Sequence, residues 1–228
     1  MRTITRHSMV VEHEGTDYEV PVIIGPVAEW MEPIVSLDGN ELKVTYLVLD
    51  DDCRDSPLDD YEGAEFRVFD SGHQRNEWIE RNITECAMCG YTEGEHEDHF
   101  DHEWEHPNPD IAKAQADGRF FWVERYEHGL VRYALTNESS AVDRQWDVAP
   151  ACAYLVLDDE WFGGDVTTEQ LTEVARSLLE EYTSWCNGDV YGIVHTTVDV
   201  TTGAEITTDS CWGFIGSDYA EAEARHEH

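Results

Sequence analysis

The sequence predicts an α+β fold, mostly antiparallel sheet with one long amphipathic helix and a small inserted zinc-binding module. Three observations lead to this prediction: short segments rich in β-branched and aromatic residues, one long stretch of apolar residues at helical spacing, and a dense cluster of Cys and His. At 228 residues the chain can bury a substantial core. We therefore expect a single α+β domain over residues 1–228, with the module inserted at residues 84–108.

The first half of the chain reads as strands. Three segments combine β-branched and aromatic residues and are bounded by Gly, Pro or Asp, at residues 18–25, 41–50 and 64–70. A short helix is expected over residues 73–83, before the cysteines, and a helical turn after Asp110, beyond the histidines.

The second half returns to strands and contains the clearest helix. Strands are expected at residues 119–126, 130–135 and 152–159. Residues 167–188 then place apolar side chains at helical spacing, with Thr167 and Gln170 forming a capping box. Two further strands flank Thr202-Gly203, which is typical of a hairpin turn.

The string YLVLDD occurs twice, at residues 46–51 and 154–159. Each copy resembles a buried strand that runs into acidic residues. A duplicated half-domain would pool these carboxylates around a divalent ion, as phosphoryl-transfer sites do. The alternative is that strand ends of an acidic protein look alike, because no other stretch repeats with the string.

Two cysteines and two histidines have the spacing of a zinc site. Cys86 and Cys89 are followed after twelve residues by His102 and after three more by His106, the C-x2-C-x12-H-x3-H order. Thiolates with imidazoles favour zinc over magnesium or calcium. Four ligands close the shell, so we expect a structural zinc, with His96 and His99 as alternate ligands.

Two other interpretations of this segment stay open. The spacing also fits a solvated loop without metal. A catalytic zinc would keep three protein ligands and a water, with a carboxylate such as Glu103 as the base. We do not expect this module to recognise DNA, because acidic residues occupy the positions where a DNA-binding zinc finger carries basic residues.

The charge of the chain is strongly negative. Fifty acidic residues stand against fourteen basic ones, giving a formal net charge of -36, and the two lysines are Lys43 and Lys113. The acids are spread along the chain, which favours adaptation to a high-salt cytoplasm; a mimic of nucleic acid is the alternative. In either case, direct binding to a nucleic-acid backbone is not expected.

We also expect a soluble, cytoplasmic protein that does not enter a membrane. The longest apolar stretch, residues 20–28, is too short and too broken to span a bilayer, and the first fifteen residues lack the apolar core of a signal peptide. Six cysteines without such a signal favour reduced thiols. In residues 209–216, Trp212, Phe214 and Ile215 are interleaved with Gly213 and Gly216, which indicates close packing in a core rather than ligand stacking by Trp212.

Three motifs resemble an uncharacterised family of phage and mobile-element proteins. They are YLVLDDDCRDSP, CNGDVYGIV and DSCWGFIG, at residues 46–57, 186–194 and 209–216. The resemblance implies a mobile-element origin, a host cytoplasm and a compact α+β domain, with the Cys and His module as an insertion. It implies no known activity.

The same resemblance bears on two further residues. Family members carry Asp-His-Ser-Gly and Pro-Trp-Asp-Ser-Gly motifs before the long helix, and this chain places His128 and Asp147 at those positions without either serine. A hydrolytic triad is therefore not available, although His128 and Asp147 remain candidates for a shared polar pocket.

These observations favour a salt-adapted accessory protein of a virus or mobile element that binds an unknown protein partner and holds a structural zinc. An enzyme is less favoured, because no complete catalytic group of residues is evident. A metal-dependent hydrolase is the first alternative. An acidic DNA mimic that inhibits a host nucleic-acid enzyme is the second.

Overall fold

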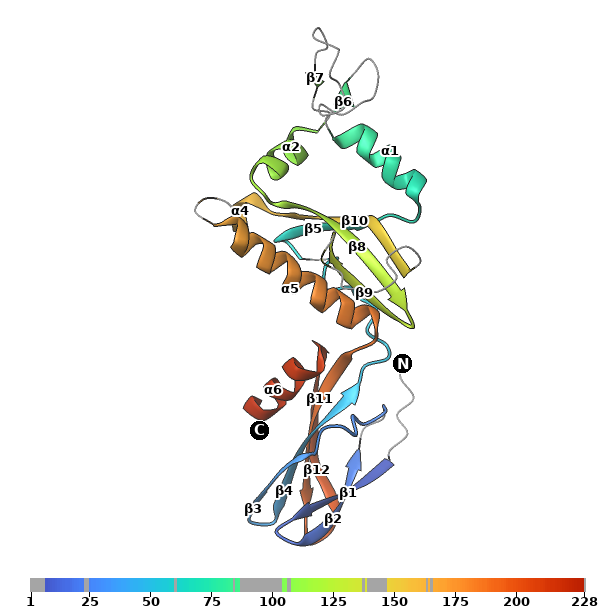
Figure 1. The fold of residues 1–228 in the computed structure, drawn as a ribbon. Coiled ribbons are helices and arrows are strands. Elements are labelled where there is room, and N and C mark those ends of the chain that lie inside the picture. Colours follow the sequence, from blue (N-terminus) through green and yellow to red (C-terminus); the bar gives the residue numbers. More distant parts are fainter. Residues whose placement is uncertain are drawn as a thin grey trace. The chain divides into compact units, whose positions relative to one another are not determined.

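The computed structural model describes residues 7–22, 25–59, 61–83, 85–86, 104–105, 108–136, 138, 147–162, 164 and 166–227. Figure 1 shows a mixture of helices and sheets. Every strand pair within the described residues is antiparallel. The predicted α+β class with mostly antiparallel sheet is therefore confirmed.

Packing divides the chain into two compact units. Unit 1 combines Met1–Asp55 with Ser184–His228, and unit 2 is the continuous segment Ser56–Thr183. Unit 2 is thus inserted into the chain of unit 1. The single domain expected over residues 1–228 stays a prediction, and most of the expected module at 84–108 lies outside the described residues.

Unit 1 contains a hairpin, a four-stranded sheet and a helix. The hairpin pairs β1 (His7–His13) with β2 (Thr16–Val22). The sheet has the order β12-β11-β4-β3, and its members are β3 (Ile34–Asp38), β4 (Glu41–Leu49), β11 (Val190–Asp199) and β12 (Ala204–Ile215). The helix α6 (Ser217–Glu227) follows β12 directly. The predicted Thr202-Gly203 turn joins β11 to β12.

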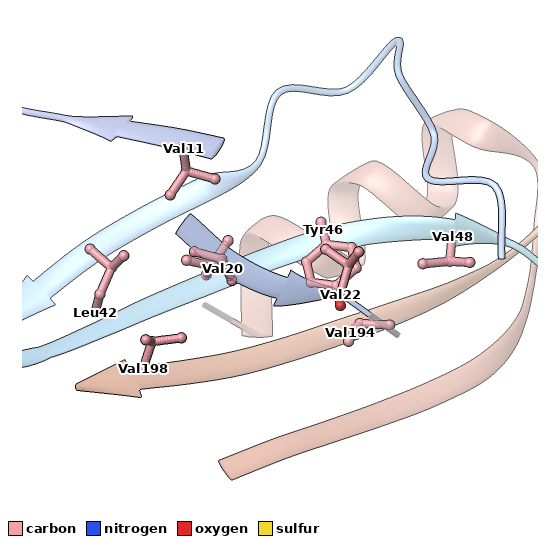
Figure 2. Packing of buried hydrophobic residues seen from close by; sticks show 9 residues of the cluster. Val11, Val20, Val22, Leu42, Tyr46, Val48, Val194 and Val198 are labelled. Atoms are coloured by element: carbon pink, nitrogen blue, oxygen red, sulfur yellow. The ribbon is translucent and has the colours of Figure 1, made fainter. Parts of the chain in front are cut away.

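The two faces of this sheet bury different partners because side chains alternate along each strand. On one face the hairpin contributes Val11, Val20 and Val22, which pack against the even-numbered residues of β4 and against Val194 and Val198 (Figure 2). On the other face α6 buries Ala220 and Ala224 in a cluster whose other members are Ala28, Met31, Leu47, Tyr191 and Ile193. Unit 1 is therefore a three-layered structure with its sheet in the middle.

Trp212 belongs to the first of these faces. Its indole packs against the hairpin cluster, and its Nε1 donates a hydrogen bond to the Ser210 hydroxyl at 3.0 Å. A Cβ placed on Gly192 would lie 2.4 Å from Cε3 of Trp212. The glycine that lets the ring approach is thus Gly192 on β11, whereas Gly213 has a positive φ of 89° and no atom near its missing Cβ.

Unit 2 is built on a second antiparallel sheet. The order is β5-β10-β8-β9, with β5 (Ala64–Val68), β8 (Phe120–His128), β9 (Leu130–Leu135) and β10 (Val148–Leu157). The helices described in this unit are α1 (Gly72–Asn82), α2 (Pro109–Ala116), α4 (Asp159–Phe162) and α5 (Thr168–Cys186), the last of which extends into unit 1. A short pair, β6 (Glu85–Cys86) with β7 (Trp104–Glu105), lies between α1 and α2.

Aromatic side chains dominate the core on one face of this sheet. Trp78 of α1 stacks on Tyr154 of β10, with ring centroids 4.3 Å apart, and Ile111 of α2 joins the same cluster. Near the C-terminal end of α5, Tyr182 contacts Phe66 and Tyr133, with ring centroids 4.7 and 5.0 Å away. Each unit therefore has its own buried core.

None of the described helices is long and apolar enough to cross a membrane.

Candidate functional site

The predicted zinc segment is described in part. Of the six candidate ligands, Cys86 has a described backbone, and Cys89, His96, His99, His102 and His106 lie outside the described residues. Elsewhere, the residues that the structure describes contain no group of three or more His, Cys, Asp and Glu that could hold a metal. The zinc site therefore stays a prediction.

The pairing of β6 with β7 adds one geometric fact about this segment. Cys86 lies opposite Trp104 in the antiparallel ladder, and Glu85 lies opposite Glu105. Residues 104–105 are thus extended, whereas a zinc finger of the C2H2 type would make them helical. The pairing brings the backbone of Cys86 within about 6 Å of a residue that is two positions from both His102 and His106.

The acids that end the second YLVLDD string are held by protein groups. Asp159 accepts a hydrogen bond from Lys113 and lies 3.5 Å from Nη2 of Arg119, whose side chain is 6% exposed. Lys113 and, to a lesser degree, Arg119 hold the pKa of Asp159 below its ordinary value. Oδ1 of Asp158 accepts a hydrogen bond from the backbone N–H of Glu160, with 2.7 Å between the oxygen and the nitrogen.

The first YLVLDD string has a different setting. Asp50 is buried and its Oδ1 accepts from the backbone N–H of Asp52 at 3.3 Å, while Asp51 and Asp52 are exposed. The strands also differ in connection: β4 pairs with β3, the strand just before it in the chain, and with β11, whereas β10 pairs with β5 and β8 and not with β9, the strand just before it. These differences favour similar strand ends over a duplicated half-domain.

His128 and Asp147 are brought together. Nδ1 of His128 lies 3.8 Å from Oδ2 of Asp147, because β8 ends at His128 and Asp147 precedes the strand β10 that pairs with β8. The His128 side chain is 75% exposed and stacks loosely on Tyr126, at 6.5 Å between centroids. Such a pair can form a surface salt bridge when the imidazole is protonated.

A second histidine contact was not evident from the sequence. Thr45 on β4 and His195 on β11 are opposite each other, with 2.8 Å between Oγ1 and Nδ1, and Asp209 on β12 is the next residue in the same row. Thr45 is almost completely buried, so this hydrogen bond satisfies a polar group in the sheet. Thr45 and His195 are 150 positions apart, and no local pattern predicts their pairing.

Four aromatic side chains of unit 1 form a connected group, which we call the aromatic row: Trp30, Tyr191, Phe214 and Tyr219. Trp30 meets Tyr191 edge to face at 5.5 Å, Tyr191 is paired with Phe214 across the sheet, and Phe214 contacts Tyr219 at 6.1 Å between ring centroids. Trp30 and Tyr219 are 49% and 55% exposed. No local sequence pattern predicts this row, because its members come from separate segments of the chain.

The row is anchored through Tyr191. Its hydroxyl donates a hydrogen bond to Oδ1 of Asp189 at 2.7 Å. Burial and, next, the bond to Asp189 raise the pKa of Tyr191 to about 12. The ring of Tyr191 is buried in a cluster with Ala220 and Ile193. The exposed rings of the row are therefore connected to a side chain that is held in the core of unit 1.

No family model, curated protein or solved structure matches the chain. The resemblance to phage and mobile-element proteins therefore remains a prediction from the three motifs.

Proposed function

We propose that the protein is a salt-adapted accessory protein of a virus or mobile element that acts in the host cytoplasm by binding another protein. The proposal rests chiefly on one observation. A chain with a net charge of -36 leaves large aromatic side chains exposed, and two of them, Trp30 and Tyr219, belong to one connected group. Exposed aromatic side chains that lie together are typical of protein interfaces.

A structural zinc is part of this proposal. The ligands would be Cys86, Cys89, His102 and His106, with His96 and His99 as alternates. The pairing of Cys86 with Trp104 supports it, because the two ends of the segment already meet. Zinc would then fix the tip of an insertion that has few apolar residues of its own.

A metal-dependent hydrolase has less support. Asp159 already has two cationic partners, which compete with a bound metal ion. His128 is mostly exposed and pairs with Asp147 at the surface, whereas a catalytic base benefits from a site that excludes water. These contacts favour structural roles for the residues that the hydrolase would have used.

The test is capture of a partner from the native host. A tagged chain is purified in about 2 M KCl, a concentration at which charge attraction between surfaces is strongly screened. We expect one protein to co-purify in near-stoichiometric amount, as measured by quantitative mass spectrometry. If no protein exceeds the tag-only control, the proposal is wrong, and zinc-dependent hydrolysis of phosphoesters or peptides by the purified chain would favour the hydrolase instead.

A further inference from the structure

We propose that the aromatic row of unit 1 is the docking site for an arginine-bearing segment of a protein partner. This inference rests on the proposed function and specifies the chemistry of the partner. It is carried by the exposure of Trp30 and Tyr219, by their connection through Tyr191 and Phe214, and by the charges around them.

The surroundings of the row are acidic. Glu29 and Glu32 flank Trp30 and are exposed, and the exposed Asp218 precedes Tyr219. Asp189 accepts a hydrogen bond from the Tyr191 hydroxyl. A second copy of the chain would bring the same carboxylates against these, so the charges favour a basic occupant.

Few basic side chains are described in unit 1. They are Lys43, Arg54 and Arg225. Arg225 also lies on α6, but its guanidinium is paired with Glu221 one turn earlier. Arg225 is therefore already paired, and the charges around the row favour a cation from a binding partner.

Arginine fits this surface better than lysine. Its guanidinium stacks on aromatic faces, binds carboxylates through two hydrogen bonds, and is less strongly hydrated than an ammonium group. Charge attraction alone would be weak in a salt-rich cytoplasm, since the Debye length at 1 M salt is only about 3 Å. Direct contact of guanidinium groups with Trp30 and Tyr219 would persist there.

The test uses two synthetic peptides of equal length, one alternating Arg with Gly and one alternating Lys with Gly. Binding to the full chain is measured by calorimetry in about 2 M KCl, where unspecific attraction is screened. We expect the arginine peptide to bind at least about fivefold more tightly than the lysine peptide. Equal affinities, or no binding of the arginine peptide, would overturn the inference.

Matched variants locate the site. Trp30→Ala and Tyr219→Ala each weaken arginine-peptide binding about fivefold to tenfold, as loss of an interface anchor does. Trp161→Ala removes an indole that is 62% exposed in unit 2 and leaves binding unchanged. Equal effects of Trp30→Ala and Trp161→Ala would contradict the assignment, and far-UV circular dichroism verifies the fold of each variant.

Three further outcomes separate this inference from the proposed function. If sedimentation shows a dimer that Trp30→Ala abolishes, the occupant is a second copy and the inference is wrong. If a host partner is captured equally by the wild-type chain and by Trp30→Ala, the inference fails while the proposed function stands. If no partner is captured at all, the proposed function fails.

Discussion

At the scale of single residues, Gly192 permits close packing between two strands of unit 1. A side chain there would meet the indole of Trp212 on the neighbouring strand. We predict that Gly192→Ala lowers the free energy of unfolding by about 1–3 kcal/mol, the usual cost of overpacking. Thermal unfolding in high KCl measures this loss.

The control for this substitution is Gly72→Ala. Gly72 begins α1, and its nearest side-chain atom, Nη2 of Arg75, is 3.9 Å from the added Cβ. The free energy of unfolding of the Gly72→Ala variant should stay within about 0.5 kcal/mol of the wild-type value or rise slightly, because alanine restricts the conformations of the unfolded chain. Equal stability of Gly192→Ala and the wild type would show that Trp212 does not pack over β11.

Tyr191 gives a prediction about pH. Its pKa of about 12 reflects burial and the nearby Asp189 carboxylate. Asp189→Asn removes the charge and should move the pKa down toward the ordinary value of about 10. Ring-carbon NMR titration, assigned with Tyr191→Phe, measures the shift, and Asp218→Asn serves as a control that leaves it unchanged.

The direction of the stability change follows from the same pKa. The folded state holds the phenol proton more tightly than the unfolded state does. Stability from this group is therefore complete below the unfolded pKa of about 10 and falls as pH rises toward about 12. A Tyr191 that titrates at its ordinary pKa in the wild-type chain would contradict the hydrogen bond to Asp189.

At the scale of elements, the capping box of α5 is one feature that local sequence predicts well. Gln170 N–H donates to Oγ1 of Thr167 at 3.3 Å, and Thr167 N–H donates to Oε1 of Gln170 at 2.9 Å. Thr167→Ala should cost about 1 kcal/mol of unfolding free energy. Chemical denaturation tests this, with exposed Ser177→Ala as a neutral or stabilising control; equal stability of Thr167→Ala and the wild type would contradict the cap.

Strands rich in β-branched residues were also predictable, but weakly patterned elements were not. The expected strand at residues 130–135 coincides with β9, and the one at residues 41–50 nearly coincides with β4. The hairpin strand β1 and the helix α6 were missed. Both contain many polar residues and bury only a few small or β-branched side chains, such as Val11 and Ala220.

Pairings across long distances were beyond sequence reasoning. The contact of Thr45 with His195 and the aromatic row depend on β4 pairing with β11, although all of unit 2 lies between them in the chain. By contrast, the resemblance to phage and mobile-element proteins pointed to His128 and Asp147, which the structure places 3.8 Å apart. Local periodicity identifies elements, whereas sites assembled from distant strands require the topology.

At the scale of the whole molecule, the net charge of -36 predicts a dependence on salt. Carboxylates repel one another over about 8 Å at physiological ionic strength but only about 3 Å at 1 M salt. We expect the fold to loosen on dialysis from concentrated KCl into dilute buffer, seen as loss of far-UV circular dichroism. Unchanged far-UV spectra in dilute buffer would contradict the proposal that the protein is adapted to high salt.

The zinc proposal also makes a prediction for the whole chain. Cys86→Ser/Cys89→Ser should abolish metal binding while leaving both compact units folded, because each unit has a buried core formed by described residues outside this segment. Metal content by mass spectrometry and unfolding in high KCl measure the two effects. Cooperative unfolding of the whole chain in this variant would contradict an inserted module.

The most direct test of the account is the coordination of the metal, because a closed structural site separates an accessory protein from a metal-dependent hydrolase. X-ray absorption at the zinc edge of the purified chain should give two sulfur ligands at about 2.3 Å and two nitrogen ligands at about 2.0–2.1 Å. Absence of zinc, or a shell of three protein ligands with a water oxygen, would contradict the account.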